Sequence, residues 1–282
     1  MNFHKSSAEI IIPDGAGQNS ALVDITHMGI GAHPDDIEII AIEGILSCFR
    51  STKRNFCGVT MTSGGGSPRG GPYENVTDTQ MRSIRKNEQK KAAIIGEYSA
   101  QIMLNYSGEE IQTTGSEPVI CDIVTILDKT RPDIIYTHNL ADKHSTHVAT
   151  CLRVIEALRR LSPRYQPKRL LGCEVWRSLD WLVGSDKIML DSSHKENLST
   201  ALLGVHDSQI SGGKRYDLAV QGRNRANATF SEAFEVDSCQ SASIAMDMME
   251  LVGDESIDPV TWIRKKIRAL ENDVLERINT CL

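Results

Sequence analysis

The sequence predicts an α/β protein in which helices flank a mostly parallel sheet. Short apolar runs alternate with longer periodic segments as far as residue 180, the pattern of successive βα units. We expect strands near 24–31, 56–62, 101–105, 133–138 and 171–176, and helices near 37–52, 79–97, 118–130 and 146–161. The helix at 118–130 shows the spacing of one helical face in Ile120, Ile123, Val124 and Leu127.

The pattern loosens after residue 180 into a C-terminal elaboration. We expect a strand at 187–190, a helix at 194–204, and then a polar stretch with Gly212, Gly213 and Gly222. The segment 258–282 begins with a proline suited to a first helical turn. Its apolar residues lie on one stripe: Ile263, Ile267, Leu270, Val274 and Ile278. Because that stripe is either core or a contact between subunits, we expect a terminal helix and a homo-oligomer.

Length and composition indicate one globular domain. The 282 residues are 40% hydrophobic and 24% charged, which excludes disordered and fibrous classes. Without a Gly/Ser or Pro linker, we expect a single domain over 1–282, with a core at about 21–180 and the elaboration at about 181–282. The net charge of −6 and the lack of a basic stripe argue against a nucleic-acid partner.

The cysteines and the N-terminal segment indicate a reducing compartment. Seven cysteines are spread along the chain without a C-x-x-C pair, which argues against a disulfide framework and against a thiolate zinc site. Residues 1–20 are polar, and no run of eighteen apolar residues occurs. We therefore expect a cytoplasmic protein with no membrane partner.

Polar side chains follow the first predicted strand in the run from Gly31 to Asp36, where His33, Asp35 and Asp36 crowd one strand end. This run is not G-x-G-x-x-G, so the glycines at 64–66 do not indicate a dinucleotide site. The aspartates could cap the following helix, but capping accounts for one aspartate more easily than for two beside a histidine.

A second polar cluster, Asp142-Lys143-His144-Ser145-Thr146-His147, follows a later strand. His144 and His147 are three residues apart and share a face on a helical turn. The ends of parallel strands meet at one sheet edge, where open α/β sheets bind ligands. Together the two clusters offer two imidazoles and a carboxylate, the ligand count of a catalytic zinc with an open position, and leave one imidazole and one carboxylate in reserve.

These motifs resemble the PIG-L or LmbE-like zinc de-N-acetylases, which remove acetyl groups from N-acetylglucosamine-containing molecules. The A-H-P-D-D motif of the family stands at 32–36, with the following acidic residue displaced to Glu38, as in variants resembling bacillithiol-pathway enzymes. The family's helical R-x-x-E-x-x-x-A-x-x-x-G segment stands at 85–96, and its E-V-W strand at 174–176. Lys195 and the stretches 206–209 and 222–225 resemble its C-terminal signature.

The resemblance implies a role for each motif residue. It makes His33, Asp36 and His147 the ligands of one Zn²⁺ per chain, although this donor set also suits Fe²⁺, Co²⁺ or Mn²⁺. Asp35 becomes the general base, and His144 the second catalytic imidazole, which stabilises the oxyanion if it is protonated.

Asp142, two residues before His144, could hold that imidazole charged. The family usually has H-P-D-H where this chain has H-S-T-H, so Thr146 replaces an aspartate that helps to orient the first histidine. The glycine loop at 62–67 also lacks the family's glutamate. We therefore expect a different substrate preference.

Three residues are candidates for binding substrate. Arg85 could bind a sugar hydroxyl or an anionic aglycone, or pair with Glu88 on the next turn. His206 could line the pocket from the C-terminal part or be a structural histidine. Trp176 could stack on a sugar ring or belong to the core.

We expect a Rossmann-like fold that hydrolyses the N-acetyl amide of an amino sugar or glycoconjugate, releasing acetate and a free amine. A catalytically silent sugar-binding or assembly-forming homologue is the main alternative. A metal-dependent phosphoesterase is less favoured because no second metal site with bridging carboxylates is evident.

Overall fold

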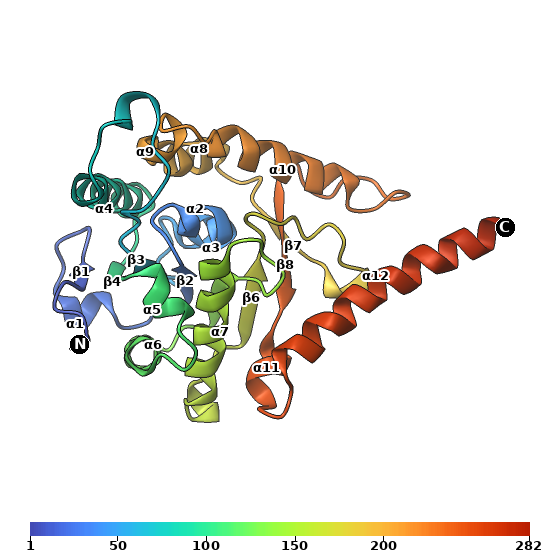
Figure 1. Ribbon diagram of the computed structural model, residues 1–282, viewed down its shortest axis with the longest axis horizontal. Helices are drawn as coiled ribbons and strands as arrows, with labels where there is room; N and C mark the ends of the chain where they lie inside the picture. Colours follow the sequence, from blue (N-terminus) through green and yellow to red (C-terminus); the bar gives the residue numbers. More distant parts are fainter.

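A computed structural model describes residues 1–282 and confirms the α/β class (Figure 1). One eight-stranded sheet contains β1 (Glu9–Ile11), β2 (His27–Gly31), β3 (Phe56–Thr62), β4 (Ala100–Tyr106), β5 (Ile134–His138), β6 (Arg169–Cys173), β7 (Ile188–Asp191) and β8 (Ala242–Asp247). The helices are α1 (Gln18–Ala21), α2 (Asp36–Ile40), α3 (Ile42–Cys48), α4 (Asp78–Ile95), α5 (Gly108–Gln112), α6 (Glu117–Thr130), α7 (Ser145–Arg159), α8 (Glu196–Gly204), α9 (Asp207–Ile210), α10 (Tyr216–Phe230), α11 (Met249–Gly253) and α12 (Pro259–Cys281).

The strand order places a topological switch in the middle of the sheet. The order is β1-β4-β3-β2-β5-β6-β8-β7, and the five strands from β4 to β6 are parallel. From β2 the chain moves outward through β3 and β4, and then returns to place β5 on the other side of β2. A crevice opens at the carboxyl ends of strands where the winding reverses, so this topology positions a site after β2 and β5.

Apolar side chains cover both faces of the sheet. On one face α6, α7 and α11 pack on the central strands in a cluster of 34 buried residues. On the other face α2, α3, α4 and α8 enclose a second cluster of 18. The strands are buried on both sides and read as nearly continuous apolar runs, as expected of a parallel sheet between two helical layers.

The expected strands and helices of the core are present, with shifts of a few residues at their ends. The helix expected at 37–52 is divided at Ala41 into α2 and α3. Strand β8, which was not expected, lies between β6 and β7. Helix α10 forms in the polar stretch where no helix was expected. The sequence shows no apolar stripe there because only three side chains of the helix are buried: Asn224, Asn227 and Ala228. Strands β7 and β8 extend the central sheet, so the C-terminal part is built into the core.

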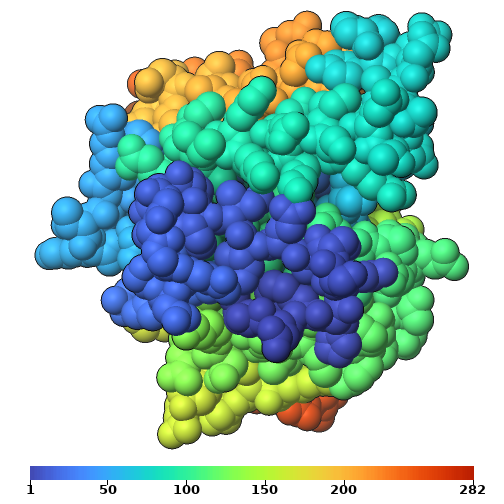
Figure 2. Space-filling model, turned by 90° about the vertical axis from the view of Figure 1, so that its left-hand side faces the viewer, coloured from blue at the N-terminus to red at the C-terminus, as the bar shows by residue number.

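The N-terminal segment covers the β1 edge of the sheet (Figure 2). Strand β1 is antiparallel to β4, and the segment is tied to helices on both faces of the sheet. Glu9 pairs with Lys86 of α4, and the backbone amide of His4 donates to Asp122 of α6 at 3.1 Å. An edge strand closed in this way is less able to pair with another chain.

Helix α12 extends away from the body of the protein (Figure 1). It is held at its base by Trp262, which is 3% exposed and donates from Nε1 to Glu250 at 2.8 Å. Farther along, Ile267, Val274 and Ile278 are about half exposed, at 52%, 46% and 49%. The outer part of the apolar stripe is therefore not core. None of the twelve helices has the length and apolarity needed to cross a membrane.

Replacing the anchor of α12 should lower stability. We expect Trp262→Ala to reduce the free energy of unfolding by about 3–5 kcal/mol, because it empties a buried aromatic site. Urea denaturation followed by circular dichroism measures the change. The control is Arg268→Ala on the same helix, where an exposed side chain should change stability by less than about 0.5 kcal/mol. Equal losses in the two variants would show that Trp262 does not anchor the helix.

Candidate metal centre

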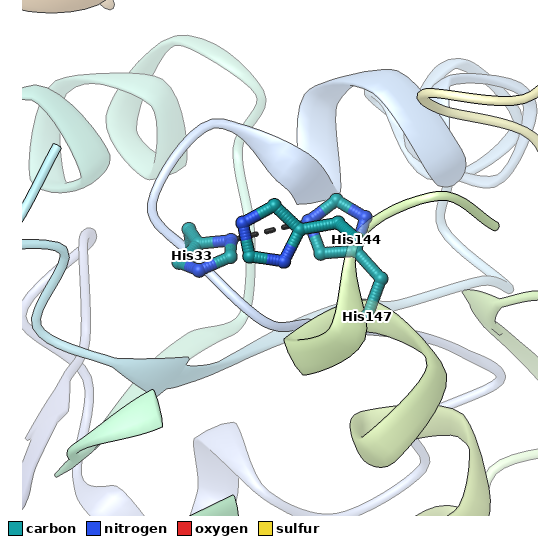
Figure 3. Close-up of side chains that lie close together, drawn as sticks. All are labelled: His33, His144 and His147. Carbon is teal, nitrogen blue, oxygen red and sulfur yellow. Dashed lines mark hydrogen bonds between the residues drawn. The ribbon is translucent and has the colours of Figure 1, made fainter. Parts of the chain in front are cut away.

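The predicted histidines meet at the switch between β2 and β5 (Figure 3). His33 lies in the turn that follows β2, whereas His144 and His147 lie at the start of α7, just after β5. The His33 and His147 ring centroids are 5.1 Å apart, and those of His144 and His147 are 4.6 Å apart. The two sequence clusters therefore form one site.

The turn from β2 into α2 is unusually tight. Asp35 has a φ of 100°, in the left-handed region, which costs energy in a non-glycine residue and often marks a functional position. A Cβ atom on Gly31 would lie 2.9 Å from Cβ of Asp36, so the close turn requires glycine there. Neither aspartate caps α2 with its side chain. Asp36 Oδ2 instead accepts the backbone N–H of His33 at 2.6 Å, so the capping interpretation is wrong.

Three potential ligand atoms converge on one point. His33 Nδ1 lies 3.2 Å from both Asp36 Oδ2 and His147 Nε2, and these two atoms lie 3.4 Å apart. Donors bound tetrahedrally to zinc at its usual bond lengths are about 3.4 Å from one another. Two imidazole nitrogens and a carboxylate oxygen in this arrangement fit a divalent ion such as zinc.

Two further imidazoles lie close but have a nitrogen committed elsewhere. His138, at the end of β5, stacks on His147, and its Nε2 accepts the backbone N–H of Ala32 at 2.9 Å. Nδ1 of His144 accepts the backbone N–H of Thr146 at 3.2 Å. Because these bonds occupy the lone pairs that a metal would need, the geometry favours the set His33, Asp36 and His147. Sequence reasoning missed His138, although it lies only four residues before the second cluster.

The charges around Asp36 suit a cation. Burial opposes ionisation of this carboxyl group, but the imidazoles of His147 and His138 hold its pKa well below the usual range. Burial alone would lower the pKa of His147, but Asp36 and Asp142 beside it raise that pKa. Asp142 Oδ1 lies 3.6 Å from His147 Nδ1 and accepts the backbone N–H of His144 at 2.9 Å. Asp142 thus orients His147, and it makes no hydrogen bond to the imidazole of His144.

Asp35 lies beside the three donors and is held by Arg85. Nη2 of Arg85 donates to Asp35 Oδ1 at 3.0 Å and to the carbonyl of Pro34, and Nη1 donates to the carbonyl of Gly64 at 3.1 Å. The guanidinium group, 4% exposed, is used in positioning Asp35 and the glycine loop. Its ion pair is with Asp35, so the alternative pairing with Glu88 is wrong. Burial raises the pKa of Asp35, despite the opposing charge of Arg85.

His144 is a neutral imidazole in this structure. Because its Nδ1 accepts a backbone N–H, the proton resides on Nε2, which is free to donate. Burial, together with His147 and His33, lowers the pKa of His144 to about 4. Thr146 cannot supply the charge of the family's aspartate, and its Oγ1 instead accepts a hydrogen bond from Gln112 at 3.0 Å. The protonated imidazole expected from the resemblance is therefore not supported.

A cavity of about 580 Å³ opens over these residues. His33, Asp35, Asp36, His144, His147 and Arg85 line it, as do the glycine loop at 64–66 and the aromatic pair Trp176 and Tyr216. The ring centroids of this pair are 5.9 Å apart in an edge-to-face contact. Trp176 is thus part of the cavity wall and not of the core.

His206 lies behind the cavity and does not line it. It is 2% exposed, and its Nε2 is 3.0 Å from Glu38 Oε2. Glu38 also accepts hydrogen bonds from Gln89 at 2.8 Å and from Tyr98 at 2.7 Å. Gln89 in turn accepts the backbone N–H of Asp35 at 3.2 Å. The expectation that His206 binds substrate is wrong, and this buried network supports the turn that carries Asp35.

A family model described as "PIG-L: GlcNAc-PI de-N-acetylase" matches residues 28–158, which include both polar clusters. The chain thus contains a PIG-L domain, which covers a little under half of its length. No curated protein matches the sequence of the chain.

Several solved structures are similar to this protein. The N,N'-diacetylchitobiose deacetylase of Pyrococcus horikoshii is 17% identical, with a TM-score of 0.63 over 86% of this chain and 90% of that one. A 4-carboxy-2-hydroxymuconate hydratase of Pseudomonas putida is 14% identical, with a TM-score of 0.61 over 79% and 96%. A zinc-inhibited form of teicoplanin deacetylase is 12% identical, with a TM-score of 0.55 over 79% and 97%. These likenesses establish the shared fold, which serves deacetylases and a hydratase alike.

The ligand set is tested by metal content. We expect the purified protein to bind about one divalent ion per chain, and His33→Ala, Asp36→Ala and His147→Ala each to lose most of it, because three donors are the minimum for such a site. His144→Ala is the matched control and should keep its metal. Inductively coupled plasma mass spectrometry measures both. Full metal content in all three ligand variants would refute the assignment.

Proposed function

We propose that this protein is a metal-dependent hydrolase that removes the acetyl group from an N-acetylated amino sugar or its glycoconjugate. The PIG-L domain and the fold shared with sugar deacetylases support this activity. The observation that carries it is Asp35, a buried carboxylate beside the convergent donors of His33, Asp36 and His147. A site that only bound metal would have no use for this strained, unligated acid.

Each residue has a distinct role in the proposed reaction. An ion held by the three donors would polarise the amide carbonyl and acidify a water molecule. Only one oxygen of Asp35 is held by Arg85, which leaves the other free to accept the proton of the attacking water. Nε2 of His144 donates a hydrogen bond to the oxygen that gains charge, and it does so as a neutral imidazole. Asp35 then returns its proton to the departing amine.

The cavity wall supports a sugar as the substrate. Trp176 presents an aromatic ring to the cavity, and its backbone N–H is fixed by Asp142 at 3.1 Å. Asp142 therefore connects the orientation of His147 with the position of the proposed sugar platform. Stacking of a sugar ring on Trp176 would hold the N-acetyl group toward the metal centre.

Acetate and amine release from N-acetylglucosamine derivatives tests the reaction class. We expect Asp35→Asn to keep its metal while kcat falls by a factor on the order of 10² to 10⁴, because the amide keeps the shape but cannot accept a proton. The control is Asp78→Asn, in which an acid that lines the same cavity at its rim is neutralised and kcat should change little.

Other outcomes separate the alternatives. Sugar binding without acetate release would identify a catalytically silent homologue, and phosphate release from phosphate esters would identify a phosphoesterase. An Asp35→Asn variant with undiminished turnover would refute the proposed role of Asp35.

We also propose that α12 joins two copies of the chain. Its apolar residues Ile263, Ile267, Leu270 and Val274 are spaced by four, three and four residues, the repeat of a two-stranded coiled coil. Ile267 and Val274 are exposed, and Ile263 and Leu270 are partly exposed. β-Branched residues at 267 and 274 alternate with Leu270, a combination that favours dimers. The helix projects far enough from the body for a second copy to lie along it (Figure 1).

Light scattering tests this association. We expect the pair of substitutions Ile267→Glu and Val274→Glu to convert a dimer into a monomer, because two charges on the stripe must be desolvated in the dimer. Lys265→Glu with Asn272→Glu, on the opposite helical face, should leave the mass unchanged. A monomeric wild-type chain would exclude the proposal.

A further inference from the structure

A second cavity of about 240 Å³ adjoins the one over the metal centre. The two cavities share five lining residues: Ile39, Val175, Trp176, Lys214 and Tyr216. Ile39 lies one helical turn after Asp36, so the second cavity begins close to the ligand set. We call this second cavity the side slot.

The walls of the side slot are largely apolar. Besides the shared aliphatic and aromatic side chains, Ala219 and Val220 of α10 line it. Pockets with such walls and a few converging polar groups are the usual form of small-molecule sites. The side slot is thus suited to an uncharged group.

Three of the four charged side chains that line the side slot already have hydrogen-bond partners in the protein. Glu174 accepts the backbone N–H groups of Leu179 and Ile244 at 2.9 and 3.1 Å, and Arg223 donates to the carbonyl of Val175. Arg215 is paired with Asp217 at 2.7 Å. The Nζ atom of Lys214 lies 4.9 Å from the ring centroid of Trp176. The ammonium group of Lys214, at the boundary shared by the two cavities, has no hydrogen-bond partner in the protein.

Two neutral polar groups in the side slot have no protein partner. The hydroxyl of Ser243 is buried, in a residue 3% exposed, and makes no hydrogen bond. Asn224, 9% exposed, also lines the slot, and its side-chain amide makes none. Because buried polar groups are nearly always paired, the hydroxyl of Ser243 points to a ligand that supplies the missing bond, and Asn224 beside it offers a second partner.

We propose that the side slot binds an apolar substituent of the substrate that carries a hydroxyl or carbonyl oxygen, for which Ser243 and Asn224 are the partners. This inference rests on the proposed function, because it extends the same substrate beyond its sugar ring. The substituent is either an N-acyl chain longer than acetyl or an apolar aglycone, which share this chemistry.

Calorimetry with two ligand series distinguishes the two sources. One series is glucosamine with N-acetyl, N-butanoyl or N-hexanoyl groups, and the other is N-acetylglucosamine with methyl, butyl or hexyl aglycones. Binding is measured with Asp35→Asn, in which turnover is suppressed. We expect the affinity to rise about two- to fourfold per added methylene in one series only, because each buried methylene contributes favourably.

Substitutions on α10 show where the chain binds. Ala219→Phe fills the side slot and should abolish the gain with chain length, whereas Ala226→Phe, on an exposed position of the same helix that lines neither cavity, should preserve it. Affinities that do not vary with length in either series, or an unchanged gain in Ala219→Phe, would overturn the proposal.

Ser243→Ala tests the polar contact. It should remove the preference for a 6-hydroxyhexyl over a hexyl chain, or for the corresponding acyl pair, without lowering the melting temperature, since the hydroxyl has no partner in the protein. An unchanged preference would overturn the assignment of Ser243.

Length-dependent binding without hydrolysis in the wild type would refute only the proposed function, whereas hydrolysis that is indifferent to length and to Ala219→Phe would refute only the side slot.

Discussion

The carboxylate of Asp36 is the point on which the rest of the site depends. It is 4% exposed, and an isolated charge at that depth would be costly. Its Oδ2 atom is surrounded by the backbone N–H of His33 and the imidazoles of His33, His138 and His147, all within 3.4 Å. His33 follows β2, His138 ends β5, and His147 lies in the first turn of α7, so the stability of one buried charge is coupled to the register of the two central strands.

The neighbouring carboxylate, Asp35, is held by a different and more distant part of the chain. Arg85 of α4 bridges Asp35, the carbonyl of Pro34 and the glycine loop. A Cβ atom at Gly64 would lie 2.6 Å from Nη1 of Arg85, and Gly64 has a φ of +66°, so glycine is required for both contact and backbone. The strained turn at Asp35 is thus held in place by Arg85 of α4, a residue outside the turn. Asp35, a rigidly held base, lies beside Asp36, a buried carboxylate that is paired with imidazoles. This arrangement is expected of a preorganised catalytic site.

Sequence reasoning anticipated the fold more fully than the site. Periodicity located the strands of the parallel core because their burial on both faces produces uninterrupted apolar runs. It missed β8, whose place between β6 and β7 depends on pairing across more than sixty residues of intervening chain. It also missed α10, whose outward face is polar. The motifs brought His33, Asp36 and His147 together correctly, but they left the neighbouring His138 unnoticed and placed His206 in a pocket that it does not line.

The sequence by itself determined the α/β class and the donor types available at the ends of β2 and β5, because both follow from local patterning and from the geometry of parallel sheets. Only the tertiary structure decided which nitrogen of each imidazole is free. The backbone N–H of Ala32 donates to Nε2 of His138, which lies 106 residues later in the sequence. The backbone N–H of Thr146 donates to Nδ1 of His144. The packing of α10 and β8 also decided that a slot opens beside Trp176. Such contacts depend on distances between remote segments, which no local pattern encodes.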